Sequence, residues 1–382
     1  MRLLIVSTLD SDEPFGAYTR PFYLGMYLAQ RFEVCQLGLN CSSVDYAKSV
    51  SVGSRGLGSY VKAIRQQIED FQPDVVYAQE TLPGVAALIA CGFGWRKRPA
   101  LFFDFHTLSA NEYWTRLATS KHRFLELKQF VKTYLAQGML ARSGKTIVAA
   151  GSPVVKGIKS WYGVEGDRVC SIRNGVPDDL IATAETVDPY QALRPAKVVV
   201  VVAPKTFQFP TNDMSVEMTV EVAKLLEADS ENIHFVVIGR TAEDVQGELP
   251  KNISFTGFLP SREDFVEHLR CADVGLLPFS KEAIAGGARN KALDYLACGI
   301  LVVSTPEGMR GLDDFGDRQH LLVAGESSQS VAETIKDACN HLENYKPLAD
   351  SATRLVEESY SWRAVADELA DVFVSKLRVN GT

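Results

Sequence analysis

Residues 281–312 carry the densest structural signals in the chain, and their sequence is KEAIAGGARNKALDYLACGILVVSTPEGMRGL. Gly286-Gly287 predicts a loop, and the apolar pattern from Asn290 predicts a short helix that ends at Gly299. Residues 300–304 are typical of a buried strand, and a second loop follows over 306–311. This order of loop, helix N-terminus, strand and glycine-containing loop is typical of the anion-binding edge of a parallel α/β sheet.

Two basic residues, Arg289 and Lys291, fall at the start of this predicted helix. The helix dipole makes each cation there unfavourable by about 0.3–1 kcal/mol, unless an anion occupies the site. A bound diphosphate would explain their placement, with backbone N–H groups around Gly286-Gly287 and Gly308-Met309 as further donors. The alternative is that both residues are solvated surface charges.

The rest of the chain predicts two doubly wound parallel sheets. Strand patterns that alternate with helix patterns lie at 3–7, 33–37, 75–78, 100–105, 146–150 and 169–172, and the alternation restarts at 198–202, 234–238, 253–255 and 274–277. The turn signal at 174–177 and the weak periodicity after it predict a Rossmann-like domain over 1–177 and a linker over 178–195. A second such domain is expected over 196–358, with a closing helix over 359–382. Ligands would bind in a cleft at the carboxyl edges of the two sheets.

Composition excludes several classes of protein. The 382 residues are 46% hydrophobic and carry a net charge of −7, which is globular and argues against a general nucleic-acid binder. The seven cysteines show no CxxC spacing and predict reduced thiols. The N-terminal apolar run is too short for a signal peptide, and no segment approaches the ~20 apolar residues of a membrane span. We therefore expect a cytoplasmic protein.

The segment 113–145 departs from the acidic average, because it holds seven Lys and Arg against one acid, Glu126. Apolar residues at helical spacing run through it, from Phe124 to Leu135. One interpretation is a helix packed on its own domain with a charged outer face. The other is peripheral docking on an anionic membrane surface, which would suit a lipid-linked acceptor.

An ordered set of motifs resembles the retaining GT-B glycosyltransferases of the family-4 (group 1) type. The segments that carry the resemblance are DVVYAQE (74–80), DFHTLSANEYW (104–114), SIRNGVP (171–177), ISFTGFLPSRED (253–264), CADVGLLPFS (271–280), NKALDYLACGILVVSTPEG (290–308) and YSWRAVADEL (360–369). The resemblance implies a nucleotide-sugar donor bound by the C-terminal domain, an acceptor bound by the N-terminal domain, no metal cofactor, and a last helix that crosses back to the first domain.

The resemblance also assigns roles to residues of the predicted edge. Such proteins carry two glutamates eight residues apart; Asp294 stands at the second position, which contacts ribose, and Gly286 replaces the first. Lys291, with Arg289 in reserve, would meet the diphosphate, as would Lys205 if it is not a solvated loop residue. Lys291, Asp294 and His106 are the expected catalytic residues.

Further residues follow from the same resemblance. The remaining donor-site candidates are Gly239, Arg240, Phe258, Gly286, Gly287, Gly308 and Met309, and the acceptor-site candidates are Gly16 and Ala17. His106 follows a strand and would contact the donor sugar or the acceptor, or else is a packed structural histidine, whereas Asp104 fixes local structure. The Asp10-Ser11-Asp12 sequence has the form of a metal-binding motif but is interpreted as a solvated turn.

These observations predict a transferase that moves a sugar from a UDP- or GDP-sugar to a saccharide or lipid-linked acceptor with retention. Its products would be surface polysaccharide or glycolipid. The missing glutamate motivates an alternative, a non-catalytic GT-B subunit that scaffolds a partner transferase. A sugar-nucleotide epimerase of the same fold should show a carboxylate and histidine set that this sequence lacks.

Overall fold

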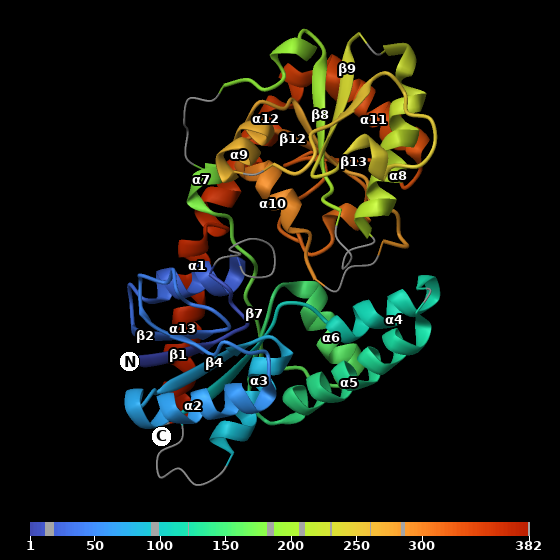
Figure 1. The fold of residues 1–382 in the computed structure, drawn as a ribbon. Helices are drawn as coiled ribbons and strands as arrows, with labels where there is room; N and C mark the ends of the chain where they lie inside the picture. Colours follow the sequence, from blue (N-terminus) through green and yellow to red (C-terminus); the bar gives the residue numbers. More distant parts are fainter. Residues whose placement is uncertain are drawn as a thin grey trace. The chain divides into compact units, whose positions relative to one another are not determined.

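The chain divides into two compact units, Met1–Gly175 with Trp362–Thr382 (unit 1) and Val176–Ser361 (unit 2). The computed structural model describes residues 1–11, 19–92, 99–120, 122–181, 187–205, 211–229, 231–259, 261–283 and 287–380. Figure 1 shows that each unit is a central sheet covered by helices. All strand pairs in both sheets are parallel. The predicted architecture of two Rossmann-like α/β domains is confirmed.

Unit 1 contains a seven-stranded sheet in the order β3-β2-β1-β4-β5-β6-β7. Its strands are β1 (Arg2–Val6), β2 (Glu33–Gly38), β3 (Lys48–Ser51), β4 (Val75–Gln79), β5 (Ala100–Phe105), β6 (Thr146–Ala149) and β7 (Val169–Ser171). Its helices are α1 (Thr19–Leu28), α2 (Leu57–Phe71), α3 (Thr81–Cys91), α4 (Ser109–Thr119), α5 (Arg123–Arg142), α6 (Ser152–Tyr162) and α13 (Trp362–Asn380).

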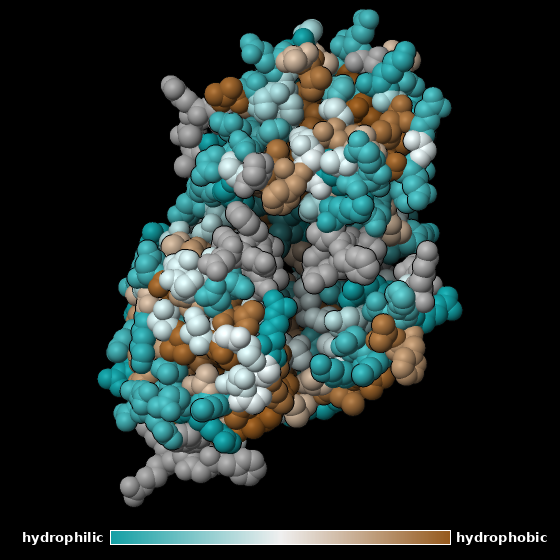
Figure 2. Space-filling view, in the orientation of Figure 1, coloured by the Kyte–Doolittle hydropathy of each residue, from teal (hydrophilic) through white to brown (hydrophobic). Residues whose placement is uncertain are grey.

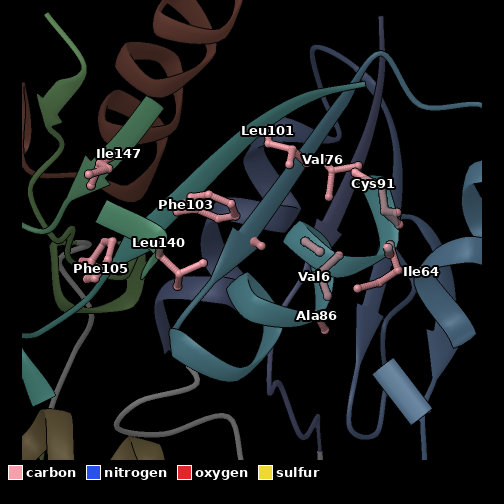
Figure 3. Packing of buried hydrophobic residues seen from close by; sticks show 14 of the residues in the cluster. Val6, Ile64, Val76, Ala86, Cys91, Leu101, Phe103, Phe105, Leu140 and Ile147 are labelled. Atoms are coloured by element: carbon pink, nitrogen blue, oxygen red, sulfur yellow. The ribbon is translucent and has the colours of Figure 1, made fainter. Parts of the chain in front are cut away.

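Alternate strand residues of unit 1 face two separate cores, as the period of two in a strand requires. Val6, Val76 and Phe103 pack with α2, α3, α5 and α6 (Figure 3). Their neighbours Ile5 and Tyr77 pack on the opposite face with α1 and α13. Helix α13 belongs to unit 1 through this core, where Trp362 stacks on Tyr23 at 5.9 Å between ring centroids.

Unit 2 contains a six-stranded sheet in the order β10-β9-β8-β11-β12-β13. Its strands are β8 (Lys197–Val202), β9 (Ile233–Ile238), β10 (Ile253–Phe255), β11 (Val274–Leu277), β12 (Leu301–Ser304) and β13 (Leu322–Val323). Its helices are α7 (Asp178–Ile181), α8 (Thr211–Leu225), α9 (Arg262–Arg270), α10 (Asn290–Ala297), α11 (Ser328–Asn340) and α12 (Leu342–Ser359), and it has 3-10 turns at Gln191–Leu193, Glu227–Asp229, Ala242–Asp244 and Glu307–Met309. Helices α9, α10 and α12 cover one face, and α8 and α11 cover the other.

Several local predictions need correction. The sequence analysis did not predict β3, which pairs with β2 although its exposed Lys and Ser side chains give no apolar signal. The basic segment 113–145, interpreted as one helix, contains parts of two helices, since α4 ends at Thr119 and α5 begins at Arg123. Residues 178–195, expected as linker, include α7 and contribute Leu180 and Tyr190 to the core of unit 2. Across the described ranges, no helix combines the length and apolarity that a membrane span needs.

Candidate functional site

Both sheets reverse their strand order at one point, and the predicted site residues gather beside these points. Strand β1 lies between β2 and β4, and β8 lies between β9 and β11. Loops that leave the carboxyl ends of such strands in opposite directions open a crevice in which ligands bind. Lys205 and Arg240 follow β8 and β9, whereas His106 follows β5 in the other unit. Each unit therefore carries its own candidate edge.

Lys291 lies in the first turn of α10 and is held in place by Asn212, a residue that the sequence analysis missed. The Lys291 ammonium group donates to Asn212 Oδ1 at 2.6 Å, and Asn212 Nδ2 donates to the Pro204 carbonyl at 2.9 Å. Burial, with the nearby Arg289 and Arg240 guanidinium groups, lowers the pKa of Lys291 to about 7. The ammonium group is therefore held at the carboxyl edge of β8. It loses its proton more readily than a surface lysine does.

Arg240 is a buried support of the same edge. Its Nε donates to the Ala203 carbonyl at 2.7 Å, and a terminal nitrogen pairs with Asp213 at 2.5 Å. Gly239 precedes it with φ 92°, and a Cβ there would lie 2.8 Å from Pro204 Cα. The loops after β8 and β9 therefore pack too tightly for any residue but glycine at this position. The exposed Lys205 completes the group and pairs with Asp244 at 2.5 Å.

Arg289, expected as a second phosphate ligand, lies immediately before α10 and is buried. Its guanidinium group stacks 3.8 Å above the Phe279 ring and pairs with Glu307 at 3.2 Å. It also donates to the Ala283 carbonyl. Burial lowers the pKa of Arg289 to about 10, which Glu307 opposes. Both of these hydrogen bonds use the same terminal nitrogen, and the buried Nε has no hydrogen-bond partner among the described residues. Arg289 therefore braces the loop before α10 and adds positive potential at the start of the helix.

Asp294 lies one turn after Lys291 on α10. Burial raises the pKa of Asp294 to about 7, against the opposing effects of Arg262 and Lys291. The Asp294 side chain is partly exposed. Its carboxylate oxygens can accept hydrogen bonds from hydroxyl groups.

The remaining candidates of unit 2 are placed as follows. Gly287 is buried before Arg289, and Phe258 is 82% exposed after β10. Gly308 and Met309 form a 3-10 turn in which their N–H groups donate to the Thr305 and Pro306 carbonyls. In this geometry those two N–H groups shape the turn and are not available to a phosphate. Gly286, Gly16 and Ala17 lie outside the described residues.

His106 in unit 1 follows β5 and is largely buried, with 15% of its side chain exposed. Its Nε2 lies 3.2 Å from Gln79 Oε1 and 3.7 Å from Asp104 Oδ1, and its Nδ1 lies 3.9 Å from Glu80 Oε1. Burial lowers the pKa of His106 to about 4, which Asp104 opposes. The imidazole is therefore neutral near pH 7, and both acceptors beside Nε2 favour a proton on that nitrogen.

Asp104 fixes local structure, and its partner Arg20 gave no signal in the sequence. The Arg20 guanidinium group pairs with the Asp104 carboxylate at 2.9 Å, and it also donates to the Ile172 and Arg173 carbonyls and to Asn174 Oδ1. Tyr77 donates its hydroxyl proton to the same carboxylate. This buried network ties β5 to the NGV segment at 174–176 and leaves Arg20 no donor to spare for a ligand.

Glu80, at the end of β4, is a second residue that the sequence analysis missed. It accepts a hydrogen bond from the Thr8 hydroxyl, and 26% of its side chain is exposed. Burial raises the pKa of Glu80 to about 7. It is the last residue of the DVVYAQE segment that carries part of the resemblance, but the sequence analysis assigned it no role of its own. No three His, Cys, Asp or Glu side chains in the described ranges are arranged to hold a metal ion. Metal independence stays a prediction.

Comparison with known proteins identifies two domains. The family model "Glycosyl transferases group 1" matches residues 196–341, and "Glycosyltransferase Family 4" matches residues 48–180. No curated protein sequence matches the chain.

Solved structures match over nearly the whole chain. Sucrose-phosphate synthase from Thermosynechococcus elongatus superposes with a TM-score of 0.74 at 12% identity, covering 99% of this chain and 100% of that one. HepE from Anabaena in complex with UDP gives 0.71 at 14% identity, covering 98% and 100%. WaaG, a glycosyltransferase involved in lipopolysaccharide biosynthesis, gives 0.67 at 16% identity, covering 97% and 99%. These likenesses establish a shared fold.

Proposed function

We propose that this chain, which is a glycosyltransferase of the GT-B fold, moves a sugar from a UDP- or GDP-sugar to a saccharide or lipid-linked acceptor, with retention and without a metal ion. The observation that carries the proposal is the Lys291 ammonium group, held at the carboxyl edge of unit 2 by Asn212. HepE structures that contain UDP and UDP-glucose support a nucleotide-sugar donor. The role of WaaG in lipopolysaccharide biosynthesis supports a surface polysaccharide or glycolipid as the product.

Cleavage of the bond between the anomeric carbon and the diphosphate passes through an oxocarbenium-like state, while negative charge grows on the leaving group. We assign Lys291 to that charge, because a fixed cation helps most where charge develops. Asn212 holds the ammonium group in position, and the buried Arg240 and Arg289 add positive potential. A bound diphosphate raises the pKa of Lys291 again, because an opposite charge favours the protonated amine.

The other candidates have supporting roles in this proposal. Asp294 accepts hydrogen bonds from the ribose hydroxyl groups, and Lys205 gives a second cation at the exposed rim. His106, as a neutral imidazole, contacts a sugar hydroxyl with its Nδ1 atom. We assign Gly239 and Phe258, which follow β9 and β10, to contacts with the base.

The test is release of nucleoside diphosphate by the purified chain from a panel of UDP- and GDP-sugars, with UDP and GDP affinities measured by calorimetry. We expect one donor to be turned over, at a rate that EDTA leaves unchanged. The anomeric configuration of the product, read by NMR, tests retention. A folded chain that binds no nucleotide and releases none would refute transfer and favour the scaffold role.

A separate observation supports docking on an anionic membrane surface. Large apolar side chains are exposed along α4 and α5, among them Trp114 (55%), Phe124 (79%) and Leu135 (64%). Exposed basic residues of α5, including Lys128 and Lys132, lie among them in the sequence. Figure 2 shows hydrophobic and hydrophilic residues next to one another over the region of α4 and α5. The carboxylate of Glu126, the acidic residue of α5, lies 3.8 Å from Arg116 Nε and pairs with that cation. Apolar side chains for the acyl boundary and cations for the headgroups suit a lipid surface, each cation contributing about 1 kcal/mol.

Vesicle flotation tests this docking. We expect the chain to float with phosphatidylcholine vesicles that contain phosphatidylglycerol and to sediment with phosphatidylcholine alone. The double variant Phe124→Ser/Leu135→Ser should lose flotation, whereas Leu225→Ser, which changes an exposed leucine of unit 2, should keep it. Flotation that does not depend on lipid charge, or that persists in the Phe124→Ser/Leu135→Ser variant, would refute the docking.

A further inference from the structure

Three side chains meet at the carboxyl edge of unit 1, beside the point where its strand order reverses. Thr8 follows β1, Glu80 follows β4 and His106 follows β5. The Thr8 hydroxyl donates to Glu80 Oε2, which leaves Oε1 facing His106 Nδ1 at 3.9 Å. The Glu80 N–H group donates to the Asp104 carbonyl at 3.0 Å, so the backbone fixes where this side chain begins.

The backbone of Glu80 has a conformation that normally requires glycine. Its φ of 73° and ψ of 171° fall in a region that a Cβ atom makes costly. The loop after β6 offers an internal comparison, because Gly151 begins the next helix with nearly the same angles, φ 93° and ψ 172°. The fold thus uses glycine for this turn at one strand end and a glutamate at the other. A strained position that keeps a partly exposed carboxylate points to a role for that carboxylate.

The two atoms that face each other in this cluster are both hydrogen-bond acceptors when Glu80 is ionised. We assign the ring proton of His106 to Nε2, which has two acceptors beside it in Gln79 Oε1 and the Asp104 carboxylate, and in this tautomer Nδ1 presents a lone pair. Glu80 Oε1 is a carboxylate oxygen beside it. Burial holds the imidazole neutral by lowering the pKa of His106 to about 4 and raises the pKa of Glu80 to about 7, so the carboxyl group is ionised above that pH.

The charges around Glu80 define which ligand this edge can accept. Asp104 raises its pKa and Arg55 lowers it, while the Thr8 hydroxyl stabilises the ionised form. The buried cation next to Asp104, Arg20, has its donors committed to the protein. An anionic ligand would meet the Glu80 carboxylate here, and the nearby Arg55 guanidinium group already acts on that carboxylate. A ligand with neutral hydroxyl donors would satisfy both acceptors.

We propose that Glu80, His106 and Thr8 form a sugar-hydroxyl subsite in unit 1, in which Glu80 Oε1 and His106 Nδ1 accept hydrogen bonds from adjacent hydroxyl groups of the saccharide. This subsite rests on the proposed function for its place in the reaction, because it is the sugar-binding counterpart of the diphosphate site in unit 2. Thr8 positions the carboxylate, and Glu80 is the residue that contacts the ligand. No proton transfer to or from the sugar is part of this assignment.

The test measures sugar binding separately from nucleotide binding. Saturation-transfer NMR with glucose, galactose, mannose and N-acetylglucosamine reports on the subsite, and calorimetry with UDP and GDP reports on unit 2 in the same samples. We expect at least one monosaccharide to bind the wild-type chain and its affinity to fall about tenfold or more in Glu80→Gln, with nucleotide affinity unchanged. Glu69→Gln, on the exposed face of α2, is the matched control and should keep sugar binding.

Glu80→Gly serves as a second variant, because glycine suits the backbone angles and keeps the fold while it removes the carboxylate. It should lose sugar binding and retain its melting temperature. Sugar binding that survives in both variants, or no monosaccharide binding to a wild-type chain that binds a nucleotide, would overturn the subsite and leave the proposed function intact. Sugar binding that depends on Glu80 in a chain that binds no nucleotide would support the subsite and count against the proposed function.

Discussion

The carboxyl edges of the two sheets have the same topology and opposite chemistry. In unit 2, three cationic side chains lie around the end of β8, namely Lys205, Arg240 and Lys291. In unit 1, the corresponding edge presents Glu80 and a neutral His106, and the Arg20 guanidinium group beside Asp104 is buried in an ion pair. Parallel strands that reverse their order determine where a ligand binds. The side chains on the loops determine that one edge suits an anion and the other suits hydroxyl groups.

The largest expected effect tests whether Arg20 is structural. Arg20→Met should lower the free energy of unfolding by about 3–5 kcal/mol, because it leaves the Asp104 carboxylate buried without its partner. Arg31→Met, which removes half-exposed ion pairs with Asp367 and Asp371, should cost no more than about 1 kcal/mol. Urea unfolding measures both. Equal effects from the two changes would show that the unit 1 cation is not a buried brace.

Lys291→Met addresses the opposite edge. We expect turnover to fall about a hundredfold or more, with weaker UDP or GDP binding, because the leaving diphosphate loses its fixed cation. Lys205→Met is the matched change, and it should have a smaller effect because Lys205 is exposed and already paired with Asp244. Steady-state kinetics and calorimetry measure the two variants side by side. If Lys291→Met keeps both activity and affinity, the cationic edge is not the donor site.

The contrast between these edges could be predicted from sequence only in part. Strand periodicity and the turn at 174–177 predicted both sheets, and glycines with a nearby lysine drew attention to Lys291. From sequence, Arg289 looked like a phosphate ligand equivalent to Lys291. Its burial against Phe279 and its ion pair with Glu307 are tertiary contacts, which the local sequence pattern does not show. The sequence analysis assigned no role to three further residues, Asn212, Arg20 and Glu80. Each of them acquires its role from a partner at least 72 residues away.

The pH dependence of nucleotide binding should distinguish the edges further. Lys291 has a lowered pKa of about 7 in the free protein, so it is protonated below pH 7 and becomes neutral above it. Because a diphosphate favours the protonated amine, the dissociation constant should rise by up to about tenfold per pH unit above pH 7. Calorimetry from pH 6 to pH 9 measures this. Asp294 also titrates near pH 7, so Lys291→Arg is the control: it keeps its charge, and a slope that persists in it belongs to Asp294.

The smallest expected effect concerns the strained backbone of unit 1. Glu80→Gly should change the free energy of unfolding by no more than about 1 kcal/mol, because relief of about 1–3 kcal/mol of strain at φ 73° offsets the lost Thr8 hydrogen bond and the added entropy of the unfolded chain. Gly151→Ala is the reverse change at nearly the same angles and should destabilise the fold by about 1–3 kcal/mol. Urea unfolding of both variants gives the comparison. If Glu80→Gly is as destabilising as Gly151→Ala, the glutamate is held by packing, and its strain is no sign of a sugar site.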